Sequence, residues 1–137
     1  MIRHRLSYWF VLSLVALYAA PAYATEILCV WQGPSGGWWT TTDNWACGVT
    51  GGPCNAGNTE FNVEIPANMG TVVLNVAAGE CVIKRLTLGD NTKLQIQDGA
   101  TLTVEEDTNI CGIIDADDDF LAEHETLVQF SCNRARV

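Results

Sequence analysis

The middle of the chain carries short apolar pairs that alternate with polar residues. Three pairs each enclose one polar residue and start eight residues apart: Leu86-x-Leu88, Leu94-x-Ile96 and Leu102-x-Val104. Residues 89–92 and 98–101, which separate the pairs, consist of Gly, Asp, Asn, Ala and Thr. A period of two bounded by such residues predicts short β-strands joined by turns.

A similar order of apolar positions occurs about one lap earlier. Val63-x-Ile65, Val72-x-Leu74 and Val82 precede Leu86, Leu94 and Val104 by 23, 22 and 22 residues, and Ile110-Cys111 would begin a third lap. This repeat predicts an all-β fold, a short parallel β-solenoid of about two to three coils. Stacking would place Val63, Leu86 and Ile110 in one buried column and Val72 with Leu94 in another. The alternative is a small β-sandwich of hairpins, in which a spacing of eight residues is also common.

The repeat divides the chain into four parts. We expect a signal peptide over residues 1–24, a Gly/Trp/Cys-rich N-terminal cap over 25–60, the solenoid coils over 61–111, and an acidic loop with a C-terminal cap or tail over 112–137. In this last part, the apolar residues from Phe120 onward lie near helical spacing. The segment Thr126 to Phe130 fits a strand nearly as well.

The N-terminus has the three parts of a secretory signal peptide. Arg3 to Arg5 form a positive start, residues 8–20 are an uncharged, largely apolar run, and Ala22-Tyr23-Ala24 predicts cleavage after Ala24. A membrane anchor is the alternative, but this run of 13 residues is shorter than the roughly 20 that span a bilayer. We therefore expect a secreted or cell-surface protein, periplasmic or extracellular, with no stable membrane insertion after cleavage.

The expected mature chain, Thr25 to Val137, has 113 residues and is strongly acidic. Without Arg3 and Arg5 it has 5 basic and 16 acidic residues, a net charge of −11. Nucleic acids and anionic membrane surfaces require clustered Lys and Arg, so neither is expected as a partner.

All six cysteines follow the expected cleavage site: Cys29, Cys47, Cys54, Cys81, Cys111 and Cys132. An even number in a short exported chain predicts up to three disulfides, with 15 connectivities for six cysteines. Cys47 and Cys54 flank a flexible Gly-rich loop and are the pair we favour. Zinc is not expected, because paired CxxC spacing is missing and the mature chain has a single histidine, His124.

Four segments follow one another in a recognisable order: "WQGPSGGW", "DNW", "EFNVEIP" and "LTLGDNTKLQIQDGATLTVEED". Together they resemble the start of bacterial exported proteins that fold as right-handed parallel β-helices, of the pectin-lyase-like or adhesin type. The layout is also similar to the extracellular domain named for its eight glycines. The resemblance covers about Trp31 to Val104 and implies a β-helical exported protein. The six cysteines and the end after about two laps depart from the bacterial group.

Tryptophans gather immediately before the first of these predicted coils, at Trp31, Trp38, Trp39 and Trp45. Large aromatic side chains there would cover the open end of a solenoid, which is the interpretation we favour. The alternative is carbohydrate binding, in which exposed indoles stack on sugar rings. Adjacent residues of a strand face opposite ways, so one of Trp38 and Trp39 is expected to face solvent. Trp38, Trp39 and Trp45 are therefore the candidate ligand-binding residues.

Motifs for catalysis are missing from the sequence. His124 is the only histidine that could serve a Ser-His-Asp site in the mature chain, and neither GxSxG nor HExxH occurs. Asp90, Asp98 and Asp107, the carboxylates that could serve a polysaccharide enzyme, fall in turns, where Asp is common for its local backbone hydrogen bonds. The sequence names no catalytic residue and leans against an enzyme.

Asp115, Asp117 and Asp119 alternate like the first ligands of an EF-hand calcium loop. The sixth position is Phe120 rather than Gly and the twelfth is Thr126 rather than Glu, so the motif fails where its geometry is strictest. A weak calcium site on the three aspartates is the one cofactor considered, and a solvated turn is its alternative.

These features predict a secreted, non-catalytic β-solenoid module for surface association or for binding glycans or cell-surface proteins. Two alternatives are a truncated or accessory relative of a β-helix polysaccharide enzyme and the N-terminal fragment of a longer adhesin.

Overall fold

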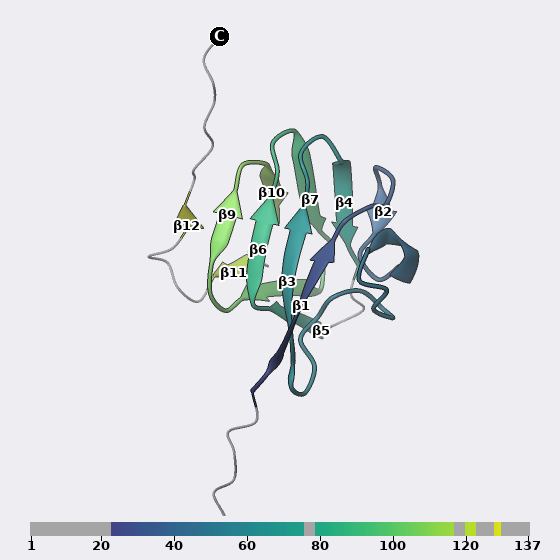
Figure 1. Ribbon diagram of the computed structural model, residues 1–137. Helices are drawn as coiled ribbons and strands as arrows, with labels where there is room; N and C mark the ends of the chain where they lie inside the picture. Colours follow the sequence, from purple (N-terminus) through teal and green to yellow (C-terminus); the bar gives the residue numbers. More distant parts are fainter. Residues whose placement is uncertain (1–22, 76–78, 117–119, 123–127, 130–137) are drawn as a thin grey trace, which may run out of the picture.

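The chain is all-β, and every named strand pairing is parallel. The computed structural model describes residues 23–75, 79–116, 120–122 and 128–129, which contain twelve strands and one short 3-10 helix. The strands form three sheets (Figure 1), which we number in the order in which the chain enters them. No helix within the described residues is long and apolar enough to cross a membrane.

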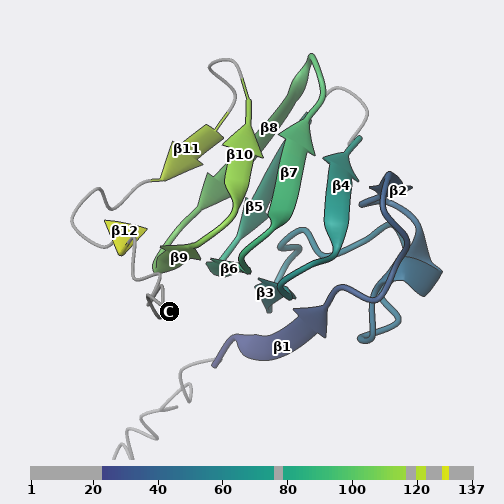
Figure 2. The ribbon, with the colours of Figure 1, turned by 90° about the horizontal axis from the view of Figure 1, so that it is seen from above.

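The chain passes through the three sheets in turn (Figure 2). Sheet 1 consists of β1 (Thr25–Val30), β3 (Thr59–Ile65), β6 (Arg85–Leu88), β9 (Thr108–Ile110) and β12 (Val128–Gln129). Sheet 2 consists of β2 (Gly37–Trp38), β4 (Gly70–Leu74), β7 (Thr92–Ile96) and β10 (Ile113–Asp115). Sheet 3 consists of β5 (Gly79–Ile83), β8 (Ala100–Val104) and β11 (Phe120–Ala122). The 3-10 helix η1 (Thr42–Asn44) lies between β2 and β3.

The pairing register confirms the main part of the predicted repeat. Val63 of β3 pairs with Leu86 of β6, and Val72 of β4 pairs with Leu94 of β7. The three apolar pairs from Leu86 to Val104 lie in β6, β7 and β8 as predicted. Since the named strand pairs in the described part of the chain are all parallel, the sandwich of antiparallel hairpins is wrong.

Two predicted alignments are shifted. Ile110 pairs with Leu88, whereas Leu86 pairs with Thr108. Val104 pairs with Ile83, whereas Val82 pairs with Thr103. Because side chains alternate between the faces of a strand, the one-residue shift in β5 turns Val82 away from the core and directs Ile83 into it.

Strands also extend beyond the predicted coil region in both directions. Strands β1 and β2 lie within the segment predicted as a cap, and β10 to β12 lie within the segment predicted as a loop and tail. Phe120–Ala122 is a strand paired with β8, so the helical prediction for its start is wrong. Val128–Gln129 pairs with β9, which agrees with the strand alternative.

Inward-facing side chains from all three sheets form one apolar core, which includes Leu86 of sheet 1, Leu94 of sheet 2 and Leu102 of sheet 3. Trp31, Trp39 and Trp45 continue this core beside β1 and β2, the edge strands of sheets 1 and 2. Their rings meet edge to face, with centroids 4.7 Å apart for Trp39 and Trp45 and 5.0 Å apart for Trp31 and Trp45. The predicted burial of large aromatic side chains beside the first strands is confirmed for these three.

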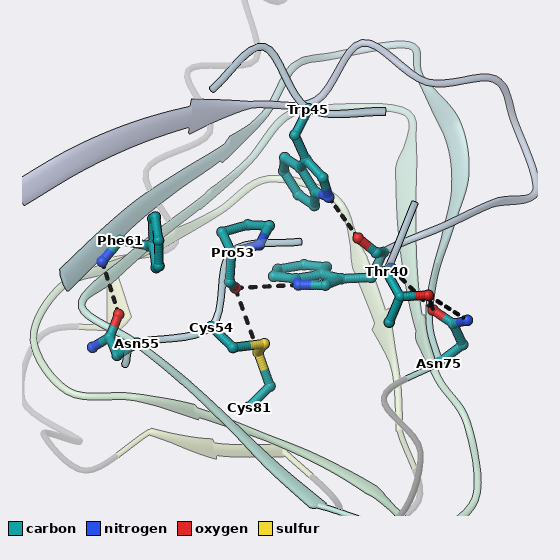
Figure 3. Close-up of a disulfide and its surroundings, with 9 residues drawn as sticks. Thr40, Trp45, Pro53, Cys54, Asn55, Phe61, Asn75 and Cys81 are labelled. Carbon is teal, nitrogen blue, oxygen red and sulfur yellow. Dashed lines mark hydrogen bonds between the residues drawn. A yellow bond between two sulfur atoms is a disulfide. The ribbon is translucent and has the colours of Figure 1, made fainter. Parts of the chain in front are cut away.

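Hydrogen bonds hold the tryptophan cluster against the loop that precedes β3. Trp45 Nε1 donates to the Trp39 carbonyl oxygen at 2.7 Å, and Trp39 Nε1 donates to the Pro53 carbonyl oxygen at 3.2 Å. Figure 3 shows Trp45 and Pro53 on either side of this junction. Gly52 has a positive φ of 81°, and a Cβ there would lie 2.2 Å from the Trp39 oxygen, so the loop requires glycine at this point.

Two disulfides join Cys29 to Cys47 and Cys54 to Cys81. The predicted Cys47–Cys54 pair is therefore wrong. The physical reason is that Gly52 and Pro53 are buried against Trp39, which directs Cys54 toward β5 (Figure 3), while Cys47 follows Trp45 back to β1. Cys81 Sγ lies 3.5 Å from the Pro53 oxygen, a contact rather than a hydrogen bond because a disulfide sulfur carries no hydrogen.

Cys111 is also disulfide-bonded, to a partner outside the described residues, and Cys132 lies outside them as well. No cysteine within the described part of the chain is free. Disulfides of this kind persist in a non-reducing compartment and are rare in the cytosol.

Candidate functional site on the outer face of sheet 2

Of the three tryptophans predicted as ligand-binding residues, the structure leaves one at the surface. Trp38 is 57% exposed, whereas Trp39 and Trp45 are 0% and 1% exposed. The buried pair has no ring face in contact with solvent, so Trp38 is the member that could contact a ligand. The expectation that Trp38 and Trp39 face opposite ways is confirmed.

Trp38 begins a row of residues that crosses sheet 2. The register places Trp38, Val73, Gln95 and Asp115 next to one another on four neighbouring strands. Neighbouring strands lie about 4.8 Å apart, so the row reaches from Trp38 roughly 10 Å to Gln95 and roughly 14 Å to Asp115. Gln95 and Asp115 are exposed, as is Trp38. An aromatic side chain, an amide and a carboxylate thus share one face in a straight line.

A second row lies two residues earlier along the strands, on the same face. It consists of Thr71, Lys93 and Ile113, which are aligned on β4, β7 and β10. Ile113 is 66% exposed. Lys93 Nζ lies 2.5 Å from Asp115 Oδ2, so an ion pair joins the two rows diagonally.

The backbone on both sides of Trp38 is fixed by its neighbours. Gly36 N donates to the Thr71 carbonyl at 2.6 Å, and Trp39 N donates to the Val73 carbonyl at 2.8 Å. The Trp38 carbonyl accepts a hydrogen bond from Asn44 Nδ2 at 3.0 Å. With Trp39 anchored in the core, the alternation of the strand presents Trp38 to solvent in a defined position.

Two hollows open beside the rows, one near each end of β7. The first, which we call the glutamine hollow, has a volume of about 450 Å³ and is lined by Gln95, Ile96, Gln97, Asp98 and Asp115. The second, the turn hollow, has a volume of about 400 Å³ and is lined mainly by residues 70–71, 90–93 and 111–113. Both volumes fall in the range of small-ligand sites. The Lys93–Asp115 ion pair lies between them, since each hollow contains one of its partners.

Stacked turns fix the start of β7 and therefore the position of Lys93. Asn68 and Asn91 both have positive φ, 63° and 53°, and Asn91 Nδ2 donates to Asn68 Oδ1 at 3.0 Å. The buried Thr92 hydroxyl donates to the Pro66 carbonyl at 2.9 Å and accepts from Met69 N at 3.1 Å. These bonds tie the turn before β7 to the turn before β4.

A separate charged cluster lies on sheet 1 and at the turn before β6. Lys84 Nζ contacts the carboxylates of Glu26, Glu60 (2.8 Å) and Glu106 (3.5 Å). Its hydrogen bonds to Glu26 and then to Glu60 raise the pKa of Lys84, and the bond from Lys84 lowers the pKa of Glu26. Arg85 pairs with Glu26, Glu106 and Asp107. This cluster joins strands of successive laps and has no hollow beside it among those described.

The remaining sequence candidates lie apart from one another. Asp98 lines the glutamine hollow, Asp90 lines the turn hollow, and Asp107 lies 3.4 Å from Arg85 Nε. Of the predicted calcium ligands, Asp115 pairs with Lys93, whereas Asp117 and Asp119 lie outside the described residues, as does His124. Within the described ranges, no group of three or more metal-ligating side chains comes together.

Sequence reasoning named Trp38 and Asp115 but missed Gln95 and Lys93. The signal was present in the repeat: once Val72 is aligned with Leu94, the next residues, Val73 and Gln95, must face outward together. Comparisons with protein-family models, with curated protein sequences and with solved structures gave no match.

Proposed function

We propose that the protein is an exported, non-catalytic three-sided parallel β-solenoid that binds glycans on the outer face of sheet 2. The observation that carries this proposal is the row in which exposed Trp38 is aligned with Gln95 and Asp115. Surface association through glycans is the role that this arrangement supports best.

Several features support the solenoid and its export. The chain visits the three sheets in a repeating order, and their inward side chains share one core. Strand β1 starts at Thr25, directly after the predicted cleavage site. The disulfides at Cys29 and Cys54 are typical of proteins in oxidising compartments.

The chemistry of the row suits a carbohydrate. A pyranose ring has an apolar face of C–H groups, which gains dispersion contacts and loses water when it lies on an indole. Its hydroxyl groups both donate and accept hydrogen bonds, and the Gln95 amide and Asp115 carboxylate offer complementary atoms. A linear chain lying across the strands would reach all three side chains, because the row is straight and roughly 14 Å long.

The test compares Trp38→Ala with Leu28→Ala on immobilised glycans. Leu28 is also 57% exposed but lies on β1 of sheet 1, so it is a matched control for the loss of an exposed apolar side chain. We expect the Trp38 variant to lose at least tenfold in affinity, about 1.4 kcal/mol, while the Leu28 variant binds like the wild type. Equal losses in the two variants, or no glycan bound by the folded wild type, would contradict the proposal.

A further inference from the structure

We infer that the glycan bound on sheet 2 is neutral, and that this face discriminates against uronate-containing and sulfated chains. This inference rests on the proposed glycan-binding function and adds the chemical class of the ligand. It follows from how the cations of the described part of the chain are used.

Recognition of a carboxylate or sulfate ester requires an available cation or a set of directed N–H donors. The described residues contain three cationic side chains, Lys84, Arg85 and Lys93. Lys84 and Arg85 belong to the charged cluster of sheet 1, where four carboxylates surround them. Lys93 is the cation on the outer face of sheet 2, and Asp115 already neutralises it at 2.5 Å.

The two hollows beside this ion pair add negative charge. Asp90 lines the turn hollow and Asp98 lines the glutamine hollow, so Lys93 faces three aspartates in all with Asp115. An acidic sugar placed there would have to displace Asp115 from Lys93 or lie beside carboxylates within a Debye length, about 8 Å at physiological ionic strength. The formal net charge of −9 also repels a polyanion before it makes contact.

A neutral sugar meets none of these costs. Its hydroxyl groups can hydrogen-bond to Gln95, to Gln97 and to the free lone pairs of Asp115 while the Lys93–Asp115 pair stays intact. The ion pair therefore acts as the specificity-determining element: it withholds the one lysine that would otherwise attract an acidic chain.

The experiment measures binding to paired glycans that share a backbone and differ in charge. The probes are cellohexaose with its C6-oxidised uronate form, galactan with polygalacturonate, and agarose with carrageenan, each with added calcium and with chelator. We expect the wild type to bind at least one neutral chain at least tenfold more tightly than its acidic partner. Equal or tighter binding of the acidic chains, with or without calcium, would overturn the inference and leave glycan binding in place. Binding to none of the six would overturn both.

A gain of acidic binding provides the independent readout. Asp115→Asn keeps the shape of the side chain and removes the charge that neutralises Lys93, so the neutral-to-acidic affinity ratio should fall at least tenfold. The gained binding should weaken as salt is added, because it depends on an exposed charge. Adding Lys93→Gln to this variant should restore the ratio. An unchanged ratio in the folded Asp115→Asn variant would refute the role assigned to the ion pair.

Discussion

Trp38 and Trp39 are adjacent in sequence, yet their replacement by alanine should affect stability very differently. Trp39 is fully buried, packs against the Trp45 ring and donates a hydrogen bond from Nε1 to the Pro53 carbonyl. Trp38 is 57% exposed. Their positions in the chain are nearly the same, so the comparison isolates burial.

The expected magnitude follows from the buried ring. An aromatic side chain buries roughly 150–250 Å², and at about 25 cal/mol per Å² this corresponds to roughly 4–6 kcal/mol. Measured Trp→Ala changes in cores cost about 3–5 kcal/mol. We therefore expect Trp39→Ala to lower the free energy of unfolding by about 4 kcal/mol, a large part of the 5–15 kcal/mol typical of a domain. Trp38→Ala should cost about 1 kcal/mol or less.

Urea denaturation of the oxidised protein, followed by circular dichroism, measures both values from the transition midpoints. Trp39→Phe gives a second value if the alanine variant does not fold: it keeps a ring but removes the N–H that bonds to Pro53, and should cost about 1–3 kcal/mol. Equal losses for Trp38→Ala and Trp39→Ala, or a loss below about 1 kcal/mol for Trp39→Ala, would refute the argument from burial.

Two further predictions concern the staples of the fold. Replacing Cys54 and Cys81 together by serine opens a loop with a sequence separation of 27, which should cost about 3.5 kcal/mol through the entropy of the unfolded chain; an unchanged urea midpoint would contradict this. Lys84→Met should lower the melting temperature at pH 7. The folded pKa of Glu26 lies below its ordinary 4.5 and that of Lys84 above its ordinary 10.5, so the stabilisation is complete between these values and is lost as pH falls through the folded pKa of Glu26 or rises through that of Lys84. The difference in melting temperature should therefore shrink in acid, and a difference independent of pH would argue against the ion pairs.

The repeat of apolar positions was readable because the inward face of a strand must be apolar at every second residue. Offsets of 23 and 22 residues placed Val63 beside Leu86 and Val72 beside Leu94. The same reasoning failed at β5, where Val82 was chosen over Ile83. Cys81 was counted as a disulfide candidate and not as an inward apolar side chain, although it is fully buried. Treating it as both would have given the alternation Cys81-x-Ile83 and the observed register.

The disulfides show why local sequence can mislead. A loop of Gly48 to Pro53 is flexible when considered alone, and it favours closure between Cys47 and Cys54. In the folded chain, Pro53 accepts a hydrogen bond from Trp39 and is buried. This tertiary contact separates the two cysteines and directs each to a different strand.

The sequence by itself determined the all-β class, the spacing of the strands and the alternation that puts Trp38 and Trp39 on opposite sides, because these depend on the local period of the backbone. Only the tertiary structure decided which tryptophan faces solvent, which cysteines meet, and that Trp38, Gln95 and Asp115 form one row. Those features join residues tens of positions apart, and their geometry is set by strand register and by burial in the shared core.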